Sequence, residues 1–179
     1  MANPRFESST NVDPGCLQSL HAEYRGLEPD ETVTIDSPLI EERGVMHRDL
    51  DSAWFADQLR HNDTHLETAW SEGDVIGFCL YSIDTGASSL PQLQQLIKEH
   101  HGSKVGYVSM ICVTKPWTRK RVGEKLLSRA MRSFESAGVE LAAAENGLLG
   151  SRQGEGRERN LIQVVRKTER RMARRLFDF

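Results

Sequence analysis

One stretch in the second half of the chain limits the fold more than any other. An almost unbroken apolar segment, Val105–Val113, is typical of a strand buried in a sheet. A proline turn ends it, and apolar residues then recur every three to four positions, which predicts an amphipathic helix from about Thr118 to Ala137. A second β-forming segment, Val139–Ala144, follows Gly138. A strand, a helix and a strand in this order predict a crossover unit, and therefore an α/β domain.

The chain before this unit predicts further strands and short helices. β-Forming residues on both sides of the turn Glu72-Gly73-Asp74 predict a hairpin over 64–83. Asp13, which precedes Pro14, is a typical N-cap residue of a helix, and either Asp51 or Ser52 can cap the next helix, which runs to about Arg60. The remaining expected elements are a strand at Arg5–Ser9, a weak strand candidate at Thr32–Ile35 and a short helix at Leu90–His100.

Residues 147–179 differ in composition from the rest. Four glycines between 147 and 156 predict a flexible loop, and apolar residues at helical spacing predict a strongly basic helix over 158–176. We therefore divide the chain into a domain over 1–146 and a segment over 147–179, whose Gly-rich loop and basic helix pack on or extend that domain.

Charge is distributed unevenly along the chain. Residues 1–100 carry 18 acidic and 6 basic side chains, whereas residues 101–179 carry 8 acidic and 17 basic ones. A basic half favours a polyanionic ligand, although the two halves packing together is the alternative explanation. The sequence has neither a membrane-spanning apolar segment nor a signal-peptide pattern. The three cysteines are scattered, so we expect reduced thiols, a cytoplasmic protein and no metal site.

The basic cluster at the start of the long helix is the strongest pointer to chemistry. The first N–H groups of a helix have no internal acceptor, and the helix dipole adds partial positive charge there. Basic residues are unfavourable at that position unless a bound anion such as pyrophosphate offsets the repulsion. Gly123 would let the backbone approach such a ligand. A surface helix with a basic start is the alternative. The basic residues are Arg119, Lys120, Arg121 and Lys125.

This segment resembles the acetyl-CoA-binding core of the GNAT superfamily of N-acetyltransferases. The resemblance rests on the order strand, Val-x-x-Pro, basic loop, Gly, Leu-Leu, long helix, Gly, strand. The family's loop pattern, Gln/Arg-x-x-Gly-x-Gly/Ala, falls on Thr118–Gly123, where only the last glycine matches. The order of elements agrees over about residues 4–146. The resemblance implies a mixed central sheet of about five to six strands flanked by helices, here with an atypical basic C-terminal helix.

The resemblance also implies an activity and a donor site. The expected enzyme transfers an acetyl group from acetyl-CoA, its co-substrate, to a primary amine by direct attack. In the family, the fourth strand pairs with the pantetheine arm, and backbone N–H groups of the loop bind the pyrophosphate. The residues expected to bind the cofactor are Ile111, Cys112, Val113, Arg119, Lys120, Arg121, Val122, Gly123 and Glu124.

The acid and base of the reaction are less clearly marked. The reaction needs a base for the amine and an acid near the leaving thiolate. Glu145 is the candidate base, because it follows the fifth expected strand; a solvated loop carboxylate is the alternative. Tyr107 and Ser109 are expected on one face of their strand, toward the substrate cleft, or are ordinary strand residues. No Tyr follows Tyr107 to match the family's usual acid. A catalytically inactive GNAT-like module that binds an acyl-CoA or a protein is therefore the alternative function.

Three further expectations concern partners and single residues. The family's last two strands find no counterpart in the tail. A sheet edge left exposed in this way would be closed either by a partner chain or by the tail helix, and we expect a homodimer. Nucleic-acid binding by the basic tail is the disfavoured interpretation. Trp117 either stacks on an adenine or anchors the turn, and we favour the anchor. Cys112 is interpreted as a small buried thiol rather than a nucleophile.

Overall fold

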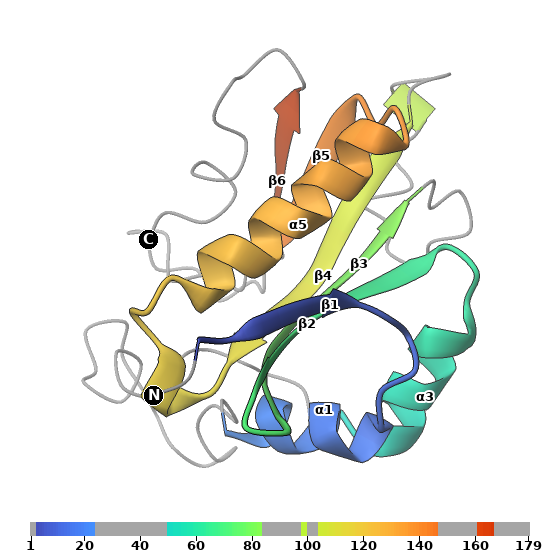
Figure 1. The fold of residues 1–179 in the computed structure, drawn as a ribbon. Helices are drawn as coiled ribbons and strands as arrows, with labels where there is room; N and C mark the ends of the chain where they lie inside the picture. The colour runs from blue at the N-terminus through green and yellow to red at the C-terminus, as the bar shows by residue number, and fades with distance from the viewer. Residues whose placement is uncertain (1–2, 24–49, 84–97, 100–103, 147–160, 167–179) are drawn as a thin grey trace, which may run out of the picture.

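The structure is a computed structural model that describes residues 3–23, 50–83, 98–99, 104–146 and 161–166 (Figure 1). These residues form one six-stranded sheet in the order β1-β2-β3-β4-β5-β6. The strands are β1 (Arg5–Ser8), β2 (Thr64–Ser71), β3 (Asp74–Ile83), β4 (Val105–Val113), β5 (Leu141–Asn146) and β6 (Leu161–Arg166). The helices are α1 (Pro14–Ala22), α3 (Ser52–Arg60), the short 3-10 helix η1 (Lys115–Trp117) and α5 (Val122–Ser136).

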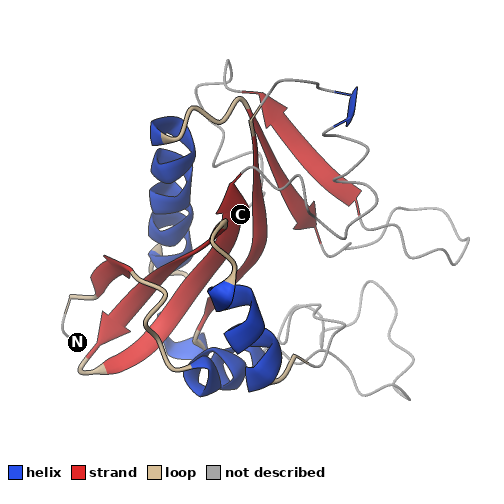
Figure 2. Cartoon of the chain, turned by 90° about the vertical axis from the view of Figure 1, so that its right-hand side faces the viewer, coloured by secondary structure: helices blue, strands red, loops and turns tan. Residues whose placement is uncertain are grey.

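Parallel pairing occurs at one place in the sheet. Strands β1 to β4 pair antiparallel, β4 and β5 pair parallel, and β5 and β6 pair antiparallel. Helix α5 makes the crossover between the two parallel strands, as the sequence predicts. It covers one face of the sheet, while α1 and α3 lie against the other (Figure 2).

Local signals in the sequence explain where these elements begin. The Asp13 carboxylate accepts a hydrogen bond from Gly15 N–H at 3.0 Å, and Asp51 accepts one from Trp54 N–H at 2.8 Å. The predicted cap at Asp13 is therefore confirmed, and of the two candidates for the second cap, Asp51 and Ser52, the structure has Asp51. The β2–β3 hairpin turns through Glu72 and Gly73, whose φ angles are 55° and 97°. Two positive φ angles in a two-residue connection match the right-handed twist of the strands.

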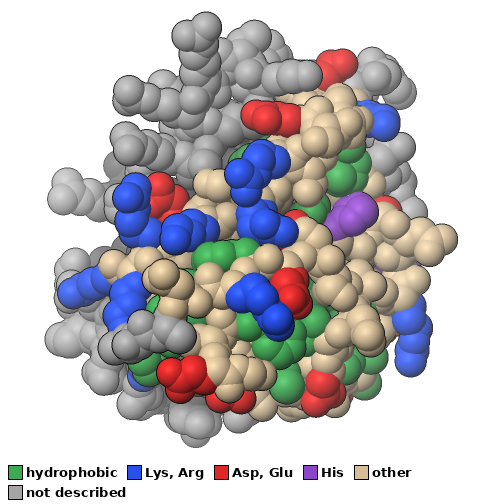
Figure 3. Space-filling model, in the orientation of Figure 1, with side chains coloured by type: hydrophobic (Ala, Val, Ile, Leu, Met, Phe, Trp, Pro, Cys, Tyr) green, Lys and Arg blue, Asp and Glu red, His purple; other side chains and the backbone are tan. Residues whose placement is uncertain are grey.

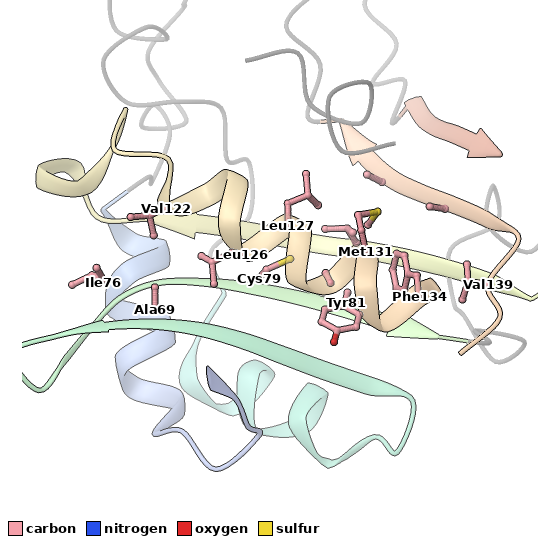
Figure 4. Close-up of a cluster of buried hydrophobic side chains, with 14 residues drawn as sticks. Ala69, Ile76, Cys79, Tyr81, Val122, Leu126, Leu127, Met131, Phe134 and Val139 are labelled. Carbon is pink, nitrogen blue, oxygen red and sulfur yellow. The ribbon is translucent and has the colours of Figure 1, made fainter. Parts of the chain in front are cut away.

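Two apolar clusters hold the layers together. Figure 4 shows the cluster under α5, where Leu126, Leu127 and Phe134 pack on Cys79 and Tyr81 of β3. The second cluster joins α1 and α3 to the opposite face. Its fully buried side chains include Leu17, Phe55, Leu66 and Phe78. Burial of one such side chain stabilises the fold by about 1.5–3 kcal/mol, so both helical layers are firmly attached to the sheet.

A buried carboxylate ties three strands to α5. Glu67 of β2 is 1% exposed and forms an ion pair with Arg129 of α5. It also accepts hydrogen bonds from the Ser8 hydroxyl at 2.6 Å and the Tyr81 hydroxyl at 3.4 Å. A buried charge is tolerated when it is paired and hydrogen-bonded in this way.

The C-terminal helix predicted over 158–176 is wrong over residues 161–166, which form β6. Helical spacing and strand-forming residues coincide in this segment, because Leu161, Ile162, Val164 and Val165 suit either structure. Pairing with the otherwise open edge of β5 favours the strand. The edge on which the homodimer prediction rested is therefore covered. The rest of the predicted helix lies outside the described residues.

Two predicted boundaries also move. The long helix begins at Val122 rather than near Thr118, because 118–121 form a turn. Strand β5 runs from Leu141 to Asn146 rather than over 139–144, which places Glu145 inside the strand. The strand candidate at 32–35 and most of the helix predicted at 90–100 lie outside the described residues. Lys98 and Glu99 of that helix are described, and both are helical.

Candidate acyl-donor site

The two parallel strands separate halfway along their length. Four residue pairs join β4 to β5, and the last of them is Val108 with Ala144. Beyond this pair β4 continues to Val113 in register with β3, while β5 continues to Asn146 in register with β6. Within the described residues, the β5-facing edge of 109–113 therefore has no strand partner (Figure 2). Backbone groups of an unpaired edge are available to an extended ligand.

A bulge marks the point of separation. In the pairing with β3, Leu80 faces Met110 and Tyr81 faces Val108, so Ser109 is the extra residue. A bulge bends its strand and redirects the backbone groups next to it. Residues on the two sides of the bulge therefore do not alternate regularly. The prediction that Tyr107 and Ser109 share one face spans this bulge and stays a prediction.

The loop between η1 and α5 has an unusual backbone. Arg119 and Arg121 have φ angles of 59° and 61°, in the left-handed region that non-glycine residues seldom adopt. Alternation between right- and left-handed residues can aim successive N–H groups into a concave anion site. The family's loop pattern has glycine at the position of Arg121, and a positive φ explains why glycine suits it.

The N-terminus of α5 lacks the cap that the other two long helices of the described chain possess. Arg121 occupies the N-cap position and makes no side-chain capping hydrogen bond. The first backbone bond donated within the helix runs from Lys125 N–H to the Arg121 carbonyl at 3.1 Å. The N–H groups of Val122 and Gly123 precede it and so have no acceptor in the helix. Such a terminus suits an anion.

Charged side chains surround this terminus. Figure 3 shows Lys and Arg side chains gathered over the first half of α5 and the loop before it. Arg121 forms a two-pronged ion pair with Glu124, with Nε–Oε2 and Nη2–Oε1 distances of 2.8 and 3.1 Å. This carboxylate raises the pKa of Arg121. The Lys120 ammonium lies 4.9 Å from the centre of the Trp117 ring. Trp117 also packs against the cluster under α5, as the anchor interpretation predicts.

The three residues expected along the pantetheine arm lie on the unpaired part of β4. Ile111 and Val113 point toward α5 and are half-buried. Cys112 points the opposite way into the second cluster and is 3% exposed. Burial raises the pKa of its thiol, and the Glu23 carboxylate raises it further. The interpretation of Cys112 as a buried thiol is confirmed. Its side chain points away from the α5 side, so only its backbone belongs to the unpaired edge of β4.

A space beside Gly123 adjoins the same edge. A Cβ atom at this position would lie 3.6 Å from Val113 Cγ2 and 3.8 Å from Ile111 Cδ1, in ordinary contact. Gly123 therefore leaves room between the start of α5 and the end of β4. The structure thus brings together the predicted loop and the predicted strand segment at one end of the sheet.

The two candidate catalytic residues lie near the separation of the strands. Tyr107 is 5% exposed and lies on the face opposite α5, because its neighbours Gly106 and Val108 face α5. Glu145 is the first residue of β5 after the last pair with β4, and its Cα partner in β6 is Ile162. Ser109 holds the equivalent place on β4.

Comparison with known protein families shows to which family the chain belongs. Residues 21–150 match the model of the acetyltransferase (GNAT) family. The chain belongs to this family. The predicted family, sheet architecture and acyltransferase class are thereby confirmed. Among curated proteins, none matches the sequence of this GNAT protein.

Solved structures share the fold of this GNAT protein at low sequence identity. The acetyltransferase from Vibrio fischeri is 17% identical with a TM-score of 0.52, and the match covers 78% of this chain and 93% of that one. Arabidopsis thaliana NAA60 in complex with acetyl-CoA is 13% identical with a TM-score of 0.54 and coverages of 80% and 74%. Aminoglycoside N-acetyltransferase AAC(6')-Iy in complex with CoA is 14% identical with a TM-score of 0.52 and coverages of 80% and 77%.

Two features of the site escaped the sequence analysis of this GNAT protein. No residue pattern in this apolar strand indicates a bulge at Ser109. The ion pair between Arg121 and Glu124 is one of many pairings that a charged loop allows. Two kinds of feature are absent from the described residues. No helix there is long and apolar enough to cross a membrane. No group of three or more His, Cys, Asp or Glu side chains there is placed to hold a metal ion.

Proposed function

We propose that this protein is an N-acetyltransferase that transfers the acetyl group of acetyl-CoA to a primary amine by direct attack. The observation that carries the proposal is the separation of β4 from β5 at Ser109, next to an uncapped helix N-terminus. The separation supplies an edge for an extended arm, and the helix terminus supplies N–H groups for its phosphates. Similar folds have been solved with acetyl-CoA in NAA60 and with CoA in AAC(6')-Iy.

The residues present fit the donor at both ends of the site. Backbone groups of Ile111, Cys112 and Val113 would pair with the pantetheine arm, since this edge is unpaired. Backbone N–H groups of 119–124 would bind the diphosphate, with added charge from Lys120 and Arg121. Acetyl-CoA supplies the activated acetyl thioester when bound.

Glu145 and Tyr107 are the residues that we propose for the chemistry. Glu145 stands at the first position of β5 beyond the last pair with β4. There it would accept a proton from the substrate ammonium, directly or through water, and the neutral amine would then attack the thioester. Tyr107 would line the substrate side, since it lies on the face opposite α5 near the bulge. A backbone N–H beside Ser109 would stabilise the oxyanion, because the bulge redirects the groups on either side of it.

The acceptor is proposed only as a class. The acidic first 100 residues suit a cationic amine, such as a protein N-terminus, a lysine, a polyamine or an aminoglycoside-like compound. One protein with a similar fold is an aminoglycoside acetyltransferase solved with sisomicin, at 16% identity and a TM-score of 0.50. An amine panel that samples these four types would find the acceptor.

Two measurements test the proposal. Titration calorimetry with CoA and acetyl-CoA measures donor binding, and release of free thiol over the amine panel measures turnover. We expect binding at micromolar concentrations and turnover with at least one amine, and Glu145→Gln should lower kcat by about 10²–10⁴-fold. The control Glu135→Gln removes a charge at the distant end of α5 and should leave kcat unchanged. Binding without turnover would instead support the inactive acyl-CoA-binding module.

The homodimer stays a prediction, with its contact moved. Strand β6 covers the edge of β5, so a dimer through this side of the sheet would use the outer edge of β6. Sedimentation at increasing protein concentration measures this association. A monomer at every concentration would contradict it.

A further inference from the structure

The first turn of α5 carries a negative charge where the proposed donor needs positive charge. Glu124 is the acidic residue in the first turn of α5, and the first turns of α1 and α3 contain none. A carboxylate at this position interacts favourably with the helix dipole, as a bound phosphate would. Glu124 thus occupies, electrostatically, the place of a phosphate.

The same carboxylate also takes up one of the loop's cations. Both Glu124 oxygens accept hydrogen bonds from Arg121, in the two-pronged geometry by which guanidinium groups bind phosphates. Arg121 cannot present the same N–H groups to a diphosphate while this pairing persists. The side chains of Arg121 and Glu124 are 72% and 48% exposed, so water and salt screen the pair and it separates readily.

From these contacts we infer that Glu124 is an internal competitor for the diphosphate of the donor. In the free protein its carboxylate holds Arg121, and donor binding exchanges this carboxylate for phosphate oxygens. Glu124 therefore weakens donor binding and hastens release of the product CoA, and it acts through Arg121 as a positioning residue. The inference rests on the proposed function, because it concerns the same anion site.

The variant Glu124→Gln tests the inference, since it keeps the size of the side chain and removes its charge. We expect CoA to bind about threefold to tenfold more tightly than to the wild type, because one like charge near the phosphates is removed. The gain should shrink at high salt. The KM for acetyl-CoA should fall in the same proportion. The matched control is Glu135→Gln, which changes the net charge equally in the last turn of α5 and should bind CoA as the wild type does.

A double-mutant cycle separates competition from a general charge effect. In the background of Arg121→Gln, Glu124 has no guanidinium to keep away from the diphosphate. Glu124→Gln should therefore give a smaller gain in affinity for CoA there than in the wild type. An equal gain in both backgrounds, or no gain over Glu135→Gln, would overturn the inference while wild-type binding leaves the proposed function standing. Absence of CoA binding to the wild type would overturn both.

Discussion

The ring of Phe134 in α5 lies against the backbone of Gly106 in β4. A Cβ atom on Gly106 would be 2.7 Å from two ring carbons of Phe134, closer than side-chain atoms approach one another. The contact brings the helix of the crossover unit down onto its first strand, close to the paired half of β4 and β5. Close packing of this kind leaves no space for a larger residue.

Gly106→Ala should therefore destabilise the protein by about 1–3 kcal/mol, because the ring or the helix must move to admit a methyl group. Urea unfolding followed by circular dichroism measures the change. Gly15→Ala is the control. A Cβ atom at Gly15 would lie 3.4 Å from the Asp13 carboxylate, in ordinary contact, and a helix favours alanine over glycine, so this variant should not lose stability. Equal stability of Gly106→Ala and the wild type would show that α5 is not seated on β4 in this way.

Removal of the partner of the buried carboxylate should be costly. Arg129→Met leaves Glu67 buried with only hydroxyl donors, and we expect a loss of about 3 kcal/mol in the free energy of unfolding. The double variant Glu67→Gln with Arg129→Met should recover part of this loss, because no buried charge remains unpaired. The urea midpoints of the single and the double variant are compared with each other. Identical midpoints would argue against a buried ion pair.

Two substitutions of Gly123 distinguish its effect on the stability of the fold from its effect on CoA binding. Gly123→Ala should fold at least as stably as the wild type, because a methyl group fits and alanine favours a helix by up to about 1 kcal/mol. Gly123→Val should weaken CoA binding, since its branches extend toward the β4 edge beside Val113 and Ile111. Thermal unfolding and calorimetry are measured on both variants. Unchanged affinity in Gly123→Val would place the donor away from this space.

Alkaline pH should destabilise the protein through Tyr81. Burial raises the pKa of Tyr81 to about 12, above the ordinary value of 10.0, and the Glu67 carboxylate adds to the rise. A group with a raised pKa in the folded state contributes its full stability below the unfolded pKa and loses it as the pH rises through the folded one. The urea midpoint should therefore fall between about pH 10 and 12, and fall less in Tyr81→Phe, which no longer titrates. Parallel pH profiles of the two proteins would contradict this.

The sequence predicted the elements whose signals are local. The caps at Asp13 and Asp51, the hairpin turn at Glu72-Gly73 and the limits of β4 follow from neighbouring residues, and the structure has them as predicted. The family resemblance supplied the architecture. Strand β6 was missed because its identity depends on the edge of β5, a partner distant in the sequence.

For the candidate site, local signals indicated the loop and the strand segment, and the binding roles of their residues stay predictions. Basic residues at a helix start indicated an anion, and the loop does lie beside the unpaired edge of β4. The start of α5 at Val122 depended on the left-handed backbone of Arg119 and Arg121, which residue type does not favour. The bulge at Ser109 arises from the register with β3, and register is a property of two strands rather than one.

The four parallel pairs from Val105 to Val108 have a mechanical consequence for the whole site. They clamp one end of both strands, and the opposite end of β4 is fixed by β3 and that of β5 by β6. The β5-facing backbone edge of 109–113 is consequently held in place before any ligand binds. The pantetheine arm of the proposed donor would pair with this edge, and little binding energy would be lost to rearrangement of the backbone.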